Sequence, residues 1–122
     1  MYTGEKGMGK NDMLELARET RKKIRKVFTD KVETITAYDI DDKPEHRTFK
    51  LNFAAYNYVW VEFDYENDWC EFFIVINEAY KQSLCNRTKF SEITDWDAYL
   101  TEIIKEIELR IPEKFLKAKG WL

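Results

Sequence analysis

FKLNFAAYNYVWVEFDYENDWCEFFIVIN, residues Phe49 to Asn77, decides how this chain folds. The stretch holds ten of the nineteen aromatic residues, and apolar and polar residues alternate within its strand-like runs. Since successive side chains of a β-strand point to opposite faces, each run divides into two sets. One set is almost entirely apolar and consists of Phe49, Leu51 and Phe53, then Val59, Val61, Phe63 and Tyr65, then Cys70, Phe72, Ile74 and Ile76. It predicts the core face of an antiparallel sheet.

The opposite set mixes charges with large aromatic rings. It consists of Tyr58, Trp60, Glu62 and Asp64 on one run and Trp69, Glu71, Phe73, Val75 and Asn77 on the next. A sheet face in contact with water is not expected to carry rings such as Trp60, Trp69 and Phe73. We therefore expect that face to be covered, by a helix of the same chain, a second subunit or a ligand. The sequence gives equal weight to a packed helix and to a binding surface.

Amphipathic helices are predicted on both sides of this stretch, because apolar residues recur there at three- and four-residue steps. They are expected over 12–30 and 94–111, each after a capping-box spacing, Asp12 with Glu15 and Thr94 with Asp97. The apolar stripe of the second helix consists of Trp96, Leu100, Ile103, Ile107 and Ile111, widened by Tyr99 and Ile104. One sheet face does not require so wide a stripe, so we predict a homodimer or larger homo-oligomer.

Three strands are expected between the helices, at 47–54, 57–65 and 69–77, and short turns make them an antiparallel meander. Residues 32–40 are rich in β-branched side chains and are predicted as a strand or extended connector. Residues 78–93 show no firm period and are predicted as a long loop, where binding residues often lie. The fold prediction is therefore α+β, with an antiparallel three- or four-stranded sheet flanked by an N-terminal and a C-terminal helix.

Length and composition predict a single domain over 1–122, with the glycine-rich residues 1–10 mobile. At 44% hydrophobic and 35% charged residues, the chain is expected to be soluble and globular. No apolar run approaches the roughly 20 residues of a membrane helix, and the N-terminus lacks the apolar segment of a secretion signal. Cys70 and Cys85 are therefore expected to be reduced thiols in a cytosolic protein.

The net charge of −3 is unevenly distributed along the chain. Residues 10–31 contain eight basic and four acidic residues, a local charge of +4, so the rest of the chain carries −7. A basic helix on an acidic body argues against general nucleic-acid binding, which favours a basic domain. It is compatible with a small anionic ligand held in a local basic pocket.

Residues suited to catalysis or metal binding are scarce. His46 is the one histidine, and it stands in an acidic turn where a solvated side chain is expected. Without a second histidine or a spaced cysteine pair, we expect no metal site, no cofactor and no catalytic residue. The segment from Gly4 to Lys10 matches the start of a phosphate-binding loop, but Asn11 replaces the Ser or Thr that binds magnesium, and no strand precedes it. We therefore assign no function to this segment.

The remaining candidates are suited to binding. The candidate ligand-binding residues are Asn77, Asn86, Arg87, Lys89 and Phe90, together with Trp60 and Phe73 on the strands. Arg87 can hold a phosphate through two hydrogen bonds, and Lys89 can act on it as a point charge. Trp60 or Phe73 can stack a purine base. Asn77 stands where a strand meets the long loop, and a turn-forming role is favoured over a base contact there.

The layout of the whole chain resembles the small phage-encoded anti-Thoeris proteins, which sequester a cyclic ADP-ribose isomer made by bacterial TIR-domain immune enzymes. The resemblance extends from the predicted basic helix at Asp12 through Phe49–Asn77 to Ile103–Leu122. It implies a protein without catalytic activity that binds this small cyclic nucleotide signal in the cytoplasm of the infected or lysogenic bacterial host. It also implies homo-oligomers with signal pockets near the subunit interface. No family motif aligns residue by residue, so the candidate residues rest on their chemistry.

The ligand of that family carries two phosphates and an adenine, which need cations, an aromatic wall and amide contacts. The chain offers these in Arg87, Lys89, Trp60, Phe73, Asn77 and Asn86. A second interpretation stays open, namely a toxin-immunity or other inhibitor protein. Its aromatic face and acidic body would dock on the basic surface of a protein partner.

Overall fold

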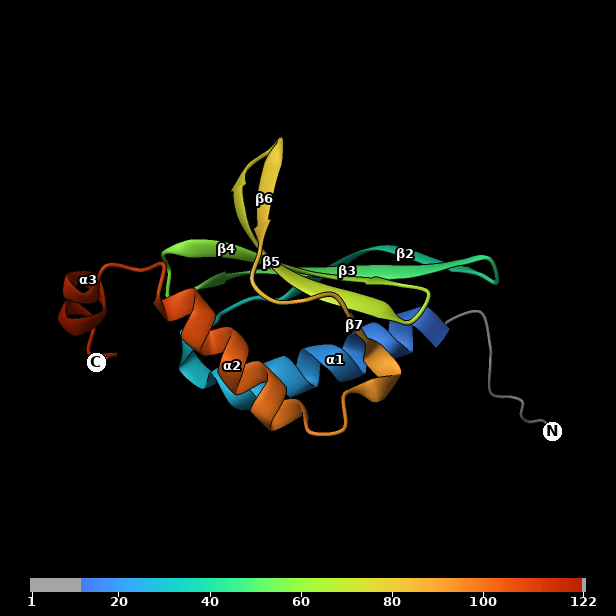
Figure 1. Cartoon of the computed structure of the whole chain (residues 1–122), viewed down its shortest axis with the longest axis horizontal. Coiled ribbons are helices and arrows are strands. Elements are labelled where there is room, and N and C mark those ends of the chain that lie inside the picture. Colours follow the sequence, from blue (N-terminus) through green and yellow to red (C-terminus); the bar gives the residue numbers. More distant parts are fainter. Residues whose placement is uncertain (1–11, 122) are drawn as a thin grey trace.

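The computed structural model describes residues 12–121, which form one sheet with its two long helices on the same side (Figure 1). The helical segments are α1 (Asp12–Phe28), η1 (Thr29–Lys31), η2 (Phe90–Glu92), α2 (Trp96–Glu108) and α3 (Glu113–Ala118). The strands are β2 (Thr36–Lys43), β3 (His46–Ala55), β4 (Val59–Glu66), β5 (Trp69–Asn77), β6 (Tyr80–Ser83) and β7 (Thr88–Lys89). The sheet is antiparallel in the order β2-β3-β4-β5-β6, with β7 paired to β5.

The two long helices and the β5–β6 hairpin lie on opposite sides of the sheet. In Figure 1, α1 and α2 lie below the sheet, α3 lies beyond one end of it, and the β5–β6 hairpin rises from the other side. The mobile segment predicted at 1–10 and the loop-like segment from Gly4 to Lys10 lie outside the described residues. The α+β class with an antiparallel sheet and helices in the N- and C-terminal regions is confirmed.

The alternation of residues 49–77 correctly predicts the core face. The buried strand residues are Phe49, Leu51, Phe53, Val61, Phe63, Tyr65, Cys70, Phe72 and Ile74. The helices bury Met13, Ala17, Thr20, Ile24 and Phe28 from α1 and Leu100, Ile103 and Ile107 from α2. Phe63 lies among these side chains, with its ring centroid 4.7 Å from Phe72 and 6.4 Å from Trp96. Ile76 is an exception at 53% exposure, because β5 continues into the hairpin beyond the helices.

The apolar stripe of α2 is accounted for within one chain. Leu100, Ile103 and Ile107 are buried in the core, and Trp96 packs edge-on against Tyr99 at 5.4 Å. The stripe therefore does not require a partner subunit. Self-association stays a prediction, which light scattering of the protein in solution tests.

The sheet has more strands than predicted, because edge strands form where a neighbour offers hydrogen bonds rather than where a strong apolar period exists. Residues 32–40 contribute most of β2, which pairs with β3 and bulges at Asp39, where φ is 51°. The predicted loop 78–93 contains β6, β7 and η2. Both short strands pair with β5, whose own alternation is strong.

The ends of both long helices differ from the predicted capping boxes. At α1, the Met13 N–H donates to Asp42 Oδ1 of β2 at 2.8 Å, while Asp12 forms an ion pair with Arg47. At α2, the capping residue is Asp95, one residue later than predicted. Sequence spacing finds a local cap, but only the fold brings the carboxylate of β2 to the start of α1.

We expect Phe63→Ala to lower the free energy of unfolding by about 3–5 kcal/mol, because it leaves a cavity in the core. Trp60→Ala, on the same strand but on the opposite face, is the matched control, and we expect a loss of under about 1 kcal/mol. Denaturant unfolding of both variants measures this difference. Equal losses would contradict the structure, since they would mean that the face of Trp60 is also packed.

Candidate functional site

The sheet face opposite α1 and α2 carries the alternate residues of every long strand, and no helix among residues 12–121 lies on it (Figure 1). The register sets these residues in rows across the sheet, namely Ala54, Trp60, Val75 and Lys81; Thr36, Asn52, Glu62, Phe73 and Ser83; Tyr38, Lys50, Asp64 and Glu71; and Asp41, Thr48, Glu66, Trp69 and Lys89. We call this surface the open face. Trp60 is 55% exposed on it, so the described residues do not supply the cover that the sequence led us to expect.

An ion cluster lies at the centre of the open face. Lys81 Nζ of β6 lies 2.7 Å from both Glu62 Oε2 and Asp64 Oδ2 of β4, and 4.2 Å from the centroid of the Phe73 ring. The Tyr38 hydroxyl of β2 donates to Glu62 Oε1 at 2.9 Å. Three strands therefore contribute to one network, in which two carboxylates share a single lysine.

The two carboxylates of this cluster differ in acidity. Burial disfavours ionisation of Glu62, but hydrogen bonds from Asp64, Lys81 and Tyr38 outweigh it and lower its pKa to about 2. Burial and the neighbouring Glu62 raise the pKa of Asp64 to about 6, although Lys81 acts in the opposite direction. Asp64 Oδ1 is also buried without a hydrogen-bond partner. Asp64 is therefore the carboxylate of the pair that takes up a proton first.

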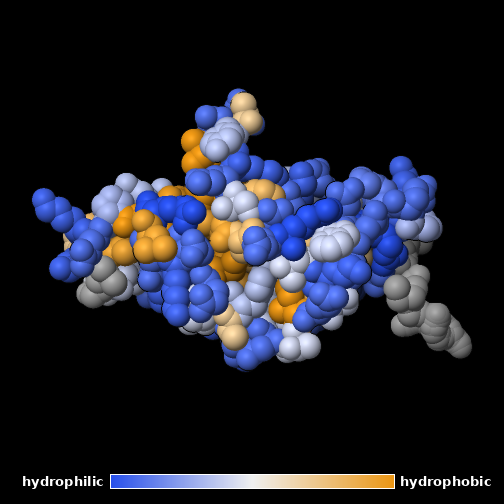
Figure 2. All heavy atoms as spheres, viewed as in Figure 1, coloured by the Kyte–Doolittle hydropathy of each residue, from blue (hydrophilic) through white to orange (hydrophobic). Residues whose placement is uncertain are grey.

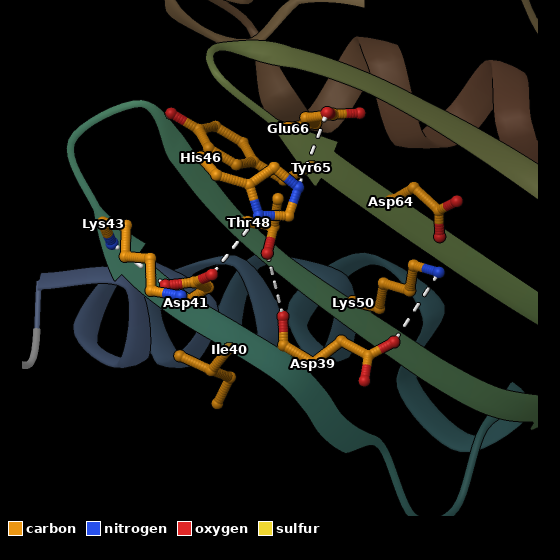
Figure 3. Close-up of a pocket in the computed structure, with 10 residues that line it drawn as sticks. All are labelled: Asp39, Ile40, Asp41, Lys43, His46, Thr48, Lys50, Asp64, Tyr65 and Glu66. Carbon is orange, nitrogen blue, oxygen red and sulfur yellow. Dashed lines mark hydrogen bonds and ion pairs between the residues drawn. The ribbon is translucent and has the colours of Figure 1, made fainter.

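An acidic trough adjoins the cluster at the β2–β3 end of the open face (Figure 3). Its cavity of about 590 Å³ is lined by Asp39, Ile40, Asp41, Lys43, His46, Thr48, Lys50, Asp64, Tyr65 and Glu66. His46 lies between Asp41 at 3.3 Å and Glu66 at 3.7 Å, and Lys50 lies 3.7 Å from Asp39. Four carboxylates and two lysines line the trough, and Lys81 pairs with Asp64 from outside it, so the carboxylates outnumber the lysines by one when His46 is neutral.

The β5–β6 hairpin forms an arm beside the open face, and Figure 2 shows it standing clear of the rest of the surface. Ile76 and Tyr80 on the arm are 53% and 59% exposed. A hollow of about 250 Å³ is lined by arm residues together with Lys50 and Glu62 of the sheet. Lys81 ties the arm to the sheet through the ion cluster.

Three of the predicted binding residues do lie close together. The Arg87 guanidinium lies 4.9 Å from the Trp69 ring centroid, and Lys89 Nζ lies 5.5 Å from it. Asn86 and Arg87 line an open hollow that also includes Arg110. The pairing of β7 with β5 is what brings the loop cations to Trp69.

The other predicted residues lie elsewhere. Along β4, Trp60 is six residues from the row of Trp69, a distance of about 20 Å. Phe73 is an exception, because it lines a hollow of about 190 Å³ together with Trp69 and Arg87. Asn77 Oδ1 accepts from the Ala79 N–H at 2.8 Å, which is the favoured turn-forming role. Phe90 packs on the helical side, with its ring 5.1 Å from Trp96.

Sequence reasoning missed the residues of the ion cluster. The alternation placed Glu62 and Asp64 on the face of Trp60, and that pair of outward carboxylates on a central strand was the available signal. Lys81 gave none, because its segment was predicted as a loop. Trp69 was assigned to the correct face but not to the site.

Comparisons with protein-family models, curated proteins and solved structures give no match. Within residues 12–121, no helix is long and apolar enough to span a membrane. In the same range, no three His, Cys, Asp or Glu side chains are grouped to hold a metal ion.

We expect Asp64→Asn to gain stability relative to the parent protein as pH rises. The folded-state pKa of Asp64, about 6, lies above its ordinary value of 3.8, so its proton stabilises the folded state at low pH and that contribution is lost on the way to pH 6. The advantage of asparagine should therefore grow between these two values and stay constant above them. Denaturant unfolding across this pH range measures it.

Glu62→Gln, two residues away on the same face, should behave in the opposite way. The pKa of Glu62 falls from 4.5 to about 2 on folding, so its ionised form stabilises the folded protein above 4.5. The variant should be less stable there, and its deficit should disappear as pH falls toward 2. If the stabilities of the two variants changed with pH in the same way, the assignment of Glu62 as the ionised and Asp64 as the more readily protonated carboxylate would be contradicted.

Proposed function

We propose that this protein acts by binding rather than by catalysis, and that the basic surface of a protein partner docks on its open face, as on a toxin-immunity or other inhibitor protein. The observation that carries the proposal is a sheet face left uncovered by the described helices, with an exposed Trp60 at one end and an acidic trough at the other. Surfaces that combine exposed aromatic rings with one sign of charge are typical of interaction sites.

Trp60 supplies an apolar anchor for such a partner. A tryptophan side chain buries 150–250 Å², and it is 55% exposed here. Covering the exposed part would contribute about 3 kcal/mol at roughly 25 cal/mol per Å². Aromatic residues of this kind often dominate the binding free energy of an interface.

The acidic trough supplies charge selection. Its excess negative charge attracts a basic surface, raises the association rate and disfavours acidic partners. Two phosphates of a nucleotide would be repelled by the same carboxylates. The open face therefore supports a basic protein partner better than an anionic small molecule.

Sequestration of a cyclic nucleotide signal is the second candidate, and one observation favours it. Arg87 and Lys89, the predicted phosphate ligands, lie around the Trp69 ring, on which a base could stack. Against it, Asp64, Glu66 and Glu71 line the same small hollow as Trp69 and Arg87. In this candidate the stacking ring is Trp69 or Phe73, which line the same hollow as Arg87, rather than Trp60.

Purification of the tagged protein from its native host tests the first proposal. We expect a protein to co-purify, and the double variant Trp60→Ala/Glu66→Lys to lose it. Leu109→Ala/Glu102→Lys is the matched control, since it removes one exposed apolar side chain and reverses one exposed glutamate in the α2 region. Equal recovery by both double variants would overturn the proposal.

Depletion of the signal tests the second candidate. The protein is incubated with an extract containing the TIR-made signal and removed by filtration, and the filtrate is assayed on the immune effector. Sequestration predicts an inactive filtrate and release of the intact nucleotide on heating. Arg87→Ala should restore activity, with a loss of roughly 2–5 kcal/mol in binding if the ion pair is desolvated. An active filtrate with the parent protein would reject this candidate.

A further inference from the structure

The open face is divided into two chemically different ends. The row of Ala54, Trp60 and Val75 crosses the sheet at one end, and the row of Asp41, Thr48 and Glu66 crosses it at the other. Trp60 and Glu66 stand on the same strand six residues apart, which is a separation of about 20 Å. The first end carries the exposed Trp60 and has Lys81 at its β6 edge. The second end holds the acidic trough on β2–β4 and has Trp69 and Lys89 at its β5–β7 edge.

The centre of the face contributes less to binding than its two ends. Glu62 and Asp64 already share Lys81, which leaves one net negative charge, and Tyr38 occupies a further acceptor position on Glu62. Breaking this network would cost its hydrogen bonds. At the trough, by contrast, carboxylates outnumber lysines, and the side chains of Asp39 and Glu66 are 63% and 55% exposed. New charge-assisted hydrogen bonds are therefore available at that end.

A second copy of this chain does not complement the trough through the same face. Depending on how two open faces are stacked, the trough would meet the carboxylates of the other trough, the end that carries Trp60, or the Trp69 ring with Arg87 and Lys89. The third arrangement offers cations, but Arg87 already lies in a hollow with Asp64, Glu66 and Glu71, so the excess carboxylates stay unneutralised. Charge complementarity therefore favours a different protein with basic side chains.

From this arrangement we infer that the open face binds a protein segment that presents an apolar side chain and, about 20 Å further along, a pair of arginine or lysine side chains. The apolar side chain covers Trp60, and the basic pair enters the trough between the carboxylates of β2 and β4 (Figure 3). This inference rests on the proposed function and adds the chemistry and spacing of the partner.

Two helical peptides of equal composition serve as molecular rulers. The first carries two leucines and, 14 residues further on the same helical face, two arginines, a spacing of about 21 Å; in the second the spacing is seven residues, about 10 Å. We expect the first peptide to bind the full-length protein roughly tenfold more tightly in isothermal titration calorimetry. Equal affinities, or no binding of either peptide, would overturn the inference.

Single variants of the protein show whether the peptide with the higher affinity contacts both ends of the open face. Trp60→Ala and Glu66→Gln should each weaken it by about fivefold or more, whereas Glu102→Gln on α2 should leave its affinity unchanged. Loss from only one of the two variants would contradict a two-ended contact. Failure of the ruler test while a host protein still co-purifies through Trp60 and Glu66 would reject the spacing and leave the proposed function standing.

Discussion

Burial of the apolar face of β3, β4 and β5 under α1 and α2 is the interaction on which the other features of this protein depend. The strand residues around Phe63 and the helix residues around Ile24 and Ile103 are almost fully buried against one another. A sheet of this size needs cover on at least one face, because three adjacent strands expose a large apolar surface. Both long helices are used on that face. The opposite face, with its aromatic rings and carboxylates, is left to the solvent or to a partner.

The open face is organised by its charges rather than by packing. Glu62 and Asp64 share Lys81 at the centre, and Tyr38 joins them from the edge strand. This cluster links the β5–β6 arm to β4 through Lys81, although the arm itself projects from the sheet (Figure 1). Away from the centre the balance changes, with an aromatic ring exposed at one end and excess carboxylates at the other. Because the two ends differ in chemistry over about 20 Å, the surface favours a partner bound in one orientation as well as contributing to its affinity.

The candidate site could be predicted only in part from sequence, because binding residues must be close in space and sequence gives only their order. Arg87 and Lys89 were predicted together as phosphate ligands, and the pairing of β7 with β5 places them at Trp69. Trp60 is chemically suited to the same site but lies about 20 Å from that row on the neighbouring strand. Phe90 turns toward the helices, since η2 joins the sheet to α2 on that side.

The sequence by itself determined which residues belong to each face of the central strands, because the period of a strand is fixed at two. It also determined that helices flank these strands, because apolar residues three and four positions apart share one face, and can be buried together, in a helix. Only the tertiary structure decided which face the helices cover, that the segment around Lys81 joins the sheet, and that Asp42 caps α1. These features depend on hydrogen-bond and charge partners that are distant in the chain. A local sequence pattern does not identify such partners, because they become neighbours only when the chain folds.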